Sequence, residues 1–193
     1  DTVTNSVLTT VPVGNGPRSP VVNSGIGKVY VPNYNDASVS VIDTLTRAVT
    51  KTIPVGSGPQ YAAVDAAHDK VYVNNVADRT ISVIDSATDS VIRTLPSGAG
   101  SDDNFGNVNH AYGRYYLANS VDNTVTIVDT DTDTVARTVP VGTKPIQIQA
   151  DLNGGNVYVV NQGSHSVSVL DATTEAVLTS YAVGTGPWRI LID

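Results

Sequence analysis

The stretch KVYVNNVADRTISVIDSATDSVIRTLPSG, residues 70–98, contains the short elements that decide the fold. Its Tyr-Val-x-Asn element recurs, with drift at the second and third positions, at 30–33, 72–75, 116–119 and 158–161. Its Val-Ile-Asp triplet recurs with conservative changes at 41–43, 83–85, 127–129 and 169–171, at spacings of 42, 44 and 42. A Pro-Val-Gly element recurs at 12–14, 54–56 and 140–142, and in altered form at 96–98 and 182–184. Three markers in one register establish an internal repeat of about 42 residues.

Each repeat consists of strand-forming segments. In the second repeat these segments are 60–65, 70–74, 79–85 and 89–95. They are rich in Val, Ile, Tyr and Thr, they end at Gly, Pro, Asn or Asp, and none has a sustained period of 3.6. In the third segment of the first repeat, Val39 and Val41 share one face and Ser40 lies on the other. The bulky face of one sheet can therefore nest on the smaller face of the next.

The predicted turns have their own recurring residues. Asp and Thr three residues apart follow the third strand at 43/46, 85/88, 129/132 and 171/174. Such side chains accept backbone N–H bonds in tight turns, so we expect them to hold the hairpin between strands three and four. Gly-x-Gly-Pro at 14–17, 56–59 and 184–187 marks the crossing between repeats, because glycine frees the backbone and proline interrupts a strand ladder.

A four-stranded antiparallel repeat of this length is the signature of a β-propeller blade. The Tyr-Val-x-Asn, Val-Ile-Asp-x-x-Thr and Pro-Val-Gly-x-x-Pro elements resemble those of the YVTN family of β-propellers over essentially the whole chain. The resemblance implies an extracellular or surface-layer protein of bacterial or archaeal type, and a ring that usually closes with seven blades. The tetrapeptide that names the family does not occur literally in this sequence.

The repeat alignment predicts one all-β propeller over residues 1–193 with about four and a half blades. Residues 1–13 align with the last strand of a preceding blade, and 188–193 with the first strand of a following blade. The chain can be a piece of a longer propeller, a half-ring completed by a second copy or another chain, or a small ring whose fifth blade is formed by both termini. The predicted blades are 18–55, 60–97, 104–141 and 146–183.

Composition narrows the functional classes. The chain has no cysteine, which excludes disulfides and thiolate chemistry, and no methionine even at position 1, which suits a processed or excised product. Charged residues are 15% of the chain and the net charge is −7, so we expect no nucleic-acid partner. No apolar run approaches the length of a membrane span, and no signal peptide is visible. Together with the resemblance, this favours a secreted or cell-surface protein.

One face of the predicted propeller holds polar and aromatic candidates for ligand binding. The loops between strands two and three and between blades lie on this face, which surrounds the central channel. Amides and a tryptophan there suit a sugar or another polar ligand. The alternative is that each recurrent asparagine only bonds the loop backbone of its own blade. The candidates are Asn33, Asn75, Asn119 and Asn161, with Arg18, Gln60, Tyr61, Lys144, Gln147, Trp188 and Arg189.

The third repeat departs from the pattern in its leading loop, 97–107. This loop carries the two-residue insertion, two carboxylates, Asp102 and Asp103, and Phe105, the only phenylalanine of the chain. Insertions in repeat proteins map to loops, often on the binding face. We expect a specific contact here, with a drifted connection as the alternative.

Two further residue sets could bear on metals. Asp129, Asp131 and Asp133 have the alternating carboxylates of some calcium loops but lack the glycine and distal glutamate of an EF-hand. Calcium is therefore a weak expectation, turn formation is the alternative, and no other cofactor is expected. The three histidines, at positions 68, 110 and 165, fall at hairpin tips without metal-binding spacing, and we interpret them as solvated loop residues.

The sequence contains no recognisable catalytic motif: no GxSxG, no P-loop and no dinucleotide fingerprint. The favoured function is a non-enzymatic extracellular or cell-surface propeller. It would act as a binding or structural scaffold for a protein or carbohydrate surface, or by self-association into a homo-oligomer. One alternative is a propeller enzyme, lactonase- or lyase-like, with its site at the channel mouth. The other is a subunit that completes the propeller of another chain and exposes Val-rich faces at its first and fourth blades.

Overall fold

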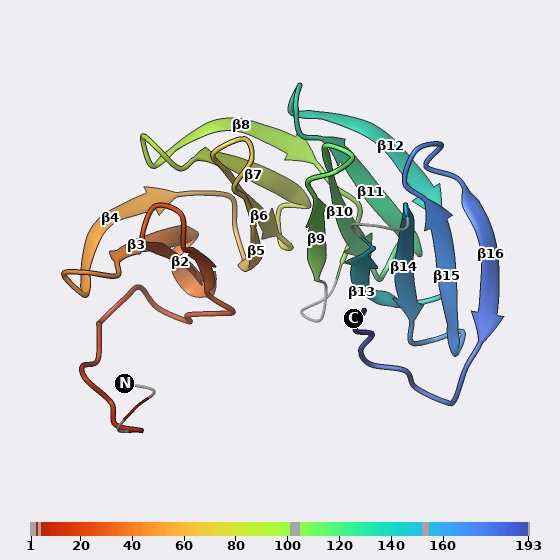
Figure 1. Cartoon of the computed structure of the whole chain (residues 1–193), viewed down its shortest axis with the longest axis horizontal. Coiled ribbons are helices and arrows are strands. Elements are labelled where there is room, and N and C mark those ends of the chain that lie inside the picture. The colour runs from red at the N-terminus through yellow and green to blue at the C-terminus, as the bar shows by residue number, and fades with distance from the viewer. Residues whose placement is uncertain (1–2, 4, 101–104, 152–154, 193) are drawn as a thin grey trace.

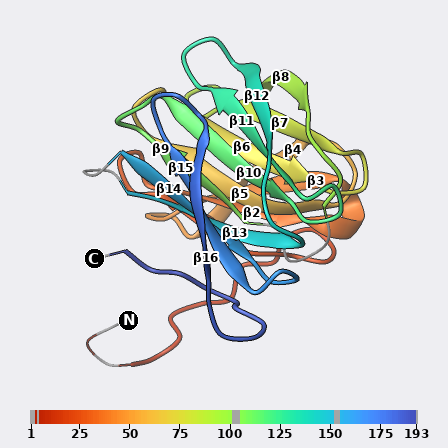
Figure 2. The ribbon, with the colours of Figure 1, turned by 90° about the vertical axis from the view of Figure 1, so that its right-hand side faces the viewer.

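The computed structural model describes residues 3, 5–100, 105–151 and 155–192. They form four sheets of four strands, arranged as an arc in Figure 1 and seen edge-on in Figure 2. The first sheet contains β1 (Val21–Asn23), β2 (Lys28–Asn33), β3 (Ser38–Asp43) and β4 (Ala48–Pro54). The second contains β5 (Pro59–Asp65), β6 (Lys70–Asn75), β7 (Thr80–Asp85) and β8 (Ser90–Pro96). The third contains β9 (Gly106–Asn109), β10 (Arg114–Asn119), β11 (Thr124–Asp129) and β12 (Thr134–Pro140). The fourth contains β13 (Pro145–Ala150), β14 (Asn156–Asn161), β15 (Ser166–Asp171) and β16 (Val177–Ala182).

Within every sheet the strands follow chain order and pair antiparallel. Each sheet is therefore one propeller blade, with its first strand toward the inside of the arc and its fourth strand outside (Figure 1). The prediction of an all-β propeller with four-stranded antiparallel blades is confirmed.

The two end segments differ from the sequence-based prediction. Residues 5–13 and 188–192 are described parts of the segments expected as single strands of neighbouring blades, and neither is a strand. A strand exists only as one side of a ladder, and no described segment pairs along either of these two. The described chain therefore contains four blades rather than four and a half, with one short 3-10 turn, η1 (Tyr34–Asp36), between β2 and β3.

Three apolar cores lie between successive blades. Tyr30, Val39 and Val41 of the first blade pack with Val71 and Ile84 of the second. Equivalent clusters join the second blade to the third and the third to the fourth. Because side chains alternate along a strand, each inner sheet is buried on both faces, as the Val/Ser alternation predicts. The stacking of whole sheets, rather than one central core, holds the arc together.

The turns between strands three and four have the predicted side-chain bonds. Asp43 Oδ1 accepts hydrogen bonds from the backbone N–H of Thr46 at 2.7 Å and from its hydroxyl at 3.0 Å. Asp85, Asp129 and Asp171 repeat this arrangement. The bonds from Thr46 hold the pKa of Asp43 below its ordinary value, because they favour the charged carboxylate.

An ion pair across each blade interface adds to the apolar cores. Lys28 Nζ of β2 lies 2.7 Å from Asp89 in the β7–β8 turn of the next blade. Lys70 and Asp133 repeat this pair at 2.9 Å, where Tyr72 Oη also donates to Asp133 at 3.0 Å. At the third interface Arg114 Nε lies 2.6 Å from Glu175. These pairs couple strand two of one blade to the outer hairpin of the next.

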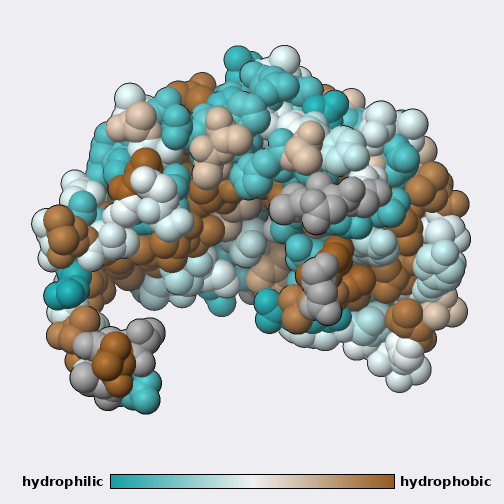
Figure 3. Space-filling model, viewed as in Figure 1, coloured by the Kyte–Doolittle hydropathy of each residue, from teal (hydrophilic) through white to brown (hydrophobic). Residues whose placement is uncertain are grey.

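Apolar side chains are exposed at both ends of the arc. Val22 of the first blade is 57% exposed, as is Leu178 of the fourth, and Tyr181 beside it is 61% exposed. Figure 3 shows hydrophobic residues on the concave side of the arc and at its ends. Among the described residues, no helix has the length and apolar character needed to cross a bilayer.

Candidate ligand-binding site

One position of the repeat faces the inside of the arc in successive blades. Contacts between neighbouring copies place these residues side by side. Ser19 forms an isolated parallel bridge with Tyr61, Phe105 N donates to Ile146 O at 3.0 Å, and Ile190 N donates to Gln147 Oε1 at 2.8 Å. The position is occupied, at spacings of 42, 44, 42 and 42, by Ser19, Tyr61, Phe105, Gln147 and Arg189.

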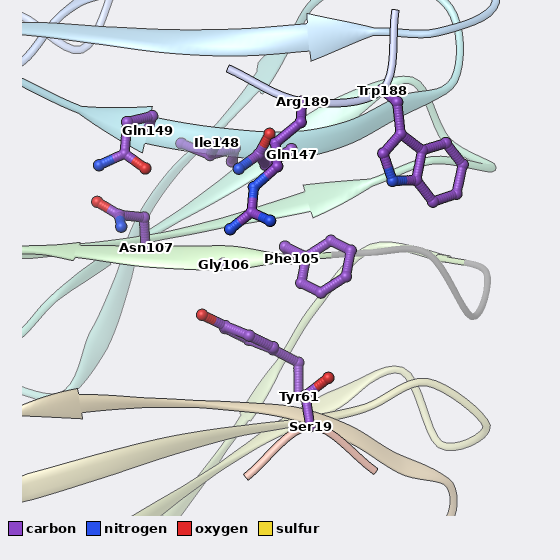
Figure 4. A pocket seen from close by; sticks show the side chains of 10 residues that line it. All are labelled: Ser19, Tyr61, Phe105, Gly106, Asn107, Gln147, Ile148, Gln149, Trp188 and Arg189. Atoms are coloured by element: carbon purple, nitrogen blue, oxygen red, sulfur yellow. The ribbon is translucent and has the colours of Figure 1, made fainter. Parts of the chain in front are cut away.

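These five residues line a cavity of about 360 Å³ at the start of the innermost strands. This volume falls in the range of small-molecule pockets. The cavity lies between β5, β9, β13 and the C-terminal segment 187–192 (Figure 4). Its remaining lining residues are Gly106, Asn107, Ile148, Gln149 and Trp188.

Aromatic rings form one side of the cavity. Tyr61 and Phe105 meet edge to face, with ring centroids 5.3 Å apart and planes at 78°. Trp188 extends from the C-terminal segment in Figure 4 and is 54% exposed. Burial raises the pKa of Tyr61 above its ordinary value although the charge of Arg189 opposes this, so its hydroxyl stays protonated at neutral pH and can donate a hydrogen bond.

Amides form the other side. Gln147 is bonded twice to the backbone of Ile190, with Oε1 accepting at 2.8 Å and Nε2 donating to the carbonyl at 3.4 Å. It thereby holds the C-terminal segment against β13 and positions Arg189 and Trp188. Asn107 Oδ1 accepts from Ala150 N at 3.2 Å, and the amides of Asn107 and Gln149 face one another in Figure 4.

The structure brings five of the predicted ligand residues together. Tyr61, Phe105, Gln147, Trp188 and Arg189 all line the cavity. Arg18 and Gln60 precede two lining residues but do not line the cavity themselves, and the guanidinium of Arg18 lies 4.8 Å from the ring centre of Tyr34. Lys144 is exposed in the turn before β13, away from the lining, and its N–H donates to Asn123 Oδ1. Asp102 and Asp103 lie outside the described residues.

Sequence reasoning missed Ser19, Gly106, Asn107, Ile148 and Gln149. The repeat itself carried a signal for two of them. Asn107 and Gln149 occupy the repeat position two residues after Phe105 and Gln147, and alternate residues of a strand point the same way. Ser19 is the first-repeat equivalent of Tyr61.

The four recurrent asparagines do not face a ligand. Asn33, Asn75, Asn119 and Asn161 are fully buried. Each Nδ2 donates to two hydroxyls of its own blade, five and seven residues later, as Asn33 does to Ser38 at 3.0 Å and Ser40 at 2.9 Å. The alternative that each asparagine serves its own blade is therefore correct, with hydroxyl groups in place of the expected loop backbone.

These asparagines also explain the glycine of Pro-Val-Gly. A Cβ on Gly56 would lie 2.7 Å from Asn75 Nδ2, and Gly98 and Gly142 stand in the same relation to Asn119 and Asn161. The glycine therefore leaves room for the buried asparagine of the following blade.

Two histidines converge on a buried carboxylate. His68 is only partly exposed, which corrects its interpretation as a solvated loop residue, whereas His110 is exposed as predicted and still contacts the same carboxylate. His68 Nδ1 lies 2.8 Å from Asp65 Oδ2, and His110 Nδ1 lies 3.0 Å from Asp65 Oδ1. His68 Nε2 lies 2.8 Å from Asp131. Burial works to raise the pKa of Asp65, but the bonds from His68 and His110 outweigh it and hold that pKa below its ordinary value. The bond to Asp65 raises the pKa of His68.

The calcium candidates point to separate partners. Asp129 Oδ2 accepts from Arg114 at 2.7 Å, Asp131 lies against His68, and Asp133 pairs with Lys70. In the described part of the chain, no group of three or more His, Cys, Asp or Glu side chains is arranged to hold a metal ion. Calcium binding stays a prediction, and it would require these three contacts to break.

Comparison with known proteins identifies the fold but does not assign the chain to a family. No protein family matches the sequence, and no curated protein does. Among solved structures, the chain is similar to Kuenenia stuttgartiensis hydrazine synthase, with 20% identity and a TM-score of 0.78 over 93% of this chain and 53% of that one. It is also similar to the β-propeller domain of Myceliophteria thermophila Cps50 (Swd1), with 12% identity and a TM-score of 0.76 over 93% of this chain and 59% of that one. The fold is a β-propeller.

A functionally unknown protein from Desulfotomaculum acetoxidans is a third structural neighbour, with 17% identity and a TM-score of 0.75 over 91% of this chain and 59% of that one. The chain thus spans between 53% and 59% of the length of these three neighbours. At such identities the likeness shows the fold alone, so the cavity must carry the functional argument.

Proposed function

We propose that this propeller is a non-catalytic binding module of the cell exterior whose channel cavity holds a saccharide. The observation that carries the proposal is the lining of the cavity: three aromatic rings and three amides around about 360 Å³. Aromatic rings pack against the C–H faces of sugar rings, and each amide offers donors and acceptors to hydroxyl groups.

The same lining supports binding over catalysis. General acid–base chemistry needs a titratable group within hydrogen-bond reach of the substrate. The described lining residues include no carboxylate and no imidazole, and Tyr61 keeps its proton. Of the three amides, Gln147 and Asn107 are already held in place by backbone bonds, which suits a pre-organised binding surface.

One observation favours a propeller enzyme as a second candidate. His68 and His110 flank the buried Asp65 at the far end of β5, and imidazoles beside a carboxylate are common in catalysis. Assay of the purified protein on lactone and polysaccharide substrates tests this candidate. We expect no turnover, and turnover that is lost in His68→Gln and His110→Gln would replace the binding proposal.

The proposed location rests on composition. The chain has only 15% charged residues, is rich in Ser, Thr and Asn, and has no cysteine, which is the composition we expect of a protein outside the cell. The same proposal includes a protein partner, or a second copy of this chain, that binds the surfaces at the two ends of the arc. Cell fractionation of a strain expressing the natural gene tests the location, and a purely cytosolic product would contradict it.

Titration of the intrinsic fluorescence of Trp188, the only tryptophan, tests saccharide binding directly. We expect a panel of oligosaccharides to include at least one that shifts the emission, and Tyr61→Ala and Phe105→Ala to weaken that binding at least tenfold. Tyr181→Ala, which removes an exposed ring on β16, is the matched control and should not change it. Binding that survives both cavity variants would place the site elsewhere, and no binding across the panel would refute the saccharide proposal.

A further inference from the structure

We infer that the cavity selects saccharides that carry a carboxylate, with Arg189 as the group that recognises it. The inference rests on the proposed saccharide site and names the ligand class. Arg189 is the only charged side chain among the described lining residues. It forms no ion pair or hydrogen bond with another described residue, whereas Lys28, Lys70 and Arg114 are all paired with carboxylates.

The position of Arg189 is set by its neighbour. Gln147 of β13 binds both the N–H and the carbonyl of Ile190, so the backbone next to Arg189 is fixed against β13. Figure 4 shows the guanidinium extending from the C-terminal segment past Gln147 toward Phe105. The charge also reaches the aromatic wall, because Arg189 works to lower the pKa of Tyr61. The guanidinium therefore lies where a ligand in the cavity would meet it.

The chemistry of guanidinium matches a carboxylate. Its planar set of N–H donors bonds both oxygens of a carboxylate at once, and such charge-assisted pairs are stronger than bonds to neutral hydroxyls. Asn107, Gln149 and the Tyr61 hydroxyl remain for the hydroxyls of the sugar. The net charge of −7 repels anions in general, so an acidic sugar would owe its binding to this local contact and not to the molecule's overall field.

Asp102 and Asp103 require their own control. They precede Phe105 in the sequence and lie outside the described residues. Any carboxylate that reached Arg189 would compete with the ligand for it. An Asp102→Asn/Asp103→Asn variant should therefore leave the preference for acidic sugars unchanged or strengthen it; if it abolishes the preference, recognition of a ligand carboxylate by Arg189 is refuted.

The test compares an α-1,4-linked galacturonic acid trimer with the neutral galactose trimer of the same linkage, by Trp188 fluorescence and calorimetry. We expect the acidic trimer to bind at least tenfold tighter at low salt. Arg189→Gln should reduce its affinity to that of the neutral trimer and leave the neutral trimer unchanged. Arg93→Gln, an exposed arginine on β8, is the control, and circular dichroism checks that both variants fold.

The outcomes separate the two proposals. Equal affinity for the two trimers, unaffected by Arg189→Gln, overturns the charge inference and leaves the saccharide site in place. Failure of both trimers and of every neutral saccharide overturns the proposed function itself. Preference for the acidic trimer that persists in Arg189→Gln assigns the anion contact to another residue and also overturns the inference.

Discussion

At the residue scale, the third blade combines a larger side chain on one strand with a smaller residue on the neighbouring strand. Tyr115 replaces the valine of the other blades (Val71 in the second) and stacks on Tyr72, with ring centroids 4.9 Å apart. Gly106 replaces the equivalent Ala62, and a Cβ there would lie 2.5 Å from Tyr115 Oη. Tyr115 is fully buried, so its ring cannot move aside. The glycine is the compensation for the extra ring.

The pair predicts that the cost of filling Gly106 depends on the residue at position 115. Gly106→Ala should lower the free energy of unfolding by about 1–3 kcal/mol, because it overpacks a closed core. In a Tyr115→Val background the same change should cost much less, since valine and alanine are the residues that the second blade has at these two positions. Urea unfolding measures both, and Gly184→Ala, with no atom near the added Cβ, is the control. Equal losses of stability in the two backgrounds would show that Gly106 does not make room for the ring of Tyr115.

His68 gives a pH-dependent contribution to stability. Its ring nitrogens contact Asp65 and Asp131, and Asp65 also contacts His110. The pKa of His68 is raised from an ordinary value of 6.5, so the folded state holds the proton more tightly than the unfolded state. Its stabilisation is complete below pH 6.5 and is lost as the pH rises through the folded pKa.

Comparison of the natural protein with His68→Gln at several pH values checks this. We expect the variant to be less stable by about 1 kcal/mol at pH 5.5–6. This is the usual contribution of a hydrogen bond to a charged group, reduced because His68 is partly exposed to solvent. The difference should shrink toward pH 8.5. His165→Gln, outside this cluster, is the control. A difference that is constant with pH would show that His68 acts by packing alone.

At the element scale, the blades are joined by a recurring contact that the motifs did not reveal. Lys70 and Tyr72 of β6 both bond Asp133 in the β11–β12 turn, and Asp133 is largely buried. The corresponding residue of the first blade is Arg47, which is exposed and has no preceding blade to contact among the described residues. Both positions have positive φ, 51° and 55°, which asparagine tolerates.

Asp133→Asn should therefore lower the free energy of unfolding by about 1.5–3 kcal/mol, the range for hydrogen bonds to a charged group. Arg47→Asn places asparagine at a position with a similar positive φ but without the ion pair, and should change the free energy of unfolding by less than about 0.5 kcal/mol. Thermal or urea unfolding of the two variants gives the comparison. Similar losses in both would mean that the backbone, not the ion pair, matters at this position.

At the scale of the whole molecule, Gln147 joins the C-terminal segment to the inner side of the arc. Removing its amide in Gln147→Ala should release Trp188, which is already 54% exposed. We expect red-shifted emission and stronger quenching by iodide, with the free energy of unfolding changed by less than about 1 kcal/mol, since the two bonds are neutral and only partly buried. Gln149→Ala, in the same cavity but without a bond to the segment, should leave quenching unchanged. Unchanged quenching in Gln147→Ala would show that other contacts hold the segment.

The amino-acid sequence by itself determined the blades. Alternation such as Val39-Ser40-Val41 and turns such as Asp43 with Thr46 are local, so their periodicity specifies strands, hairpins and stacking before any long-range contact is known. The same reasoning placed Tyr61, Gln147, Trp188 and Arg189 on one face, because that face follows from repeat register, and it singled out Phe105 in the divergent loop of the third repeat.

Only the tertiary structure decided which of these residues share a cavity, and that His68, His110 and Asp65 meet. His68 and Asp65 are only three positions apart, but the contacts between blades, such as that of His110 with Asp65, join residues more than forty positions apart. The distances across blades depend on the angle between stacked blades, which no local pattern encodes. The end segments 5–13 and 188–192 are not strands in this structure because strand formation depends on a ladder partner, which local propensity cannot supply.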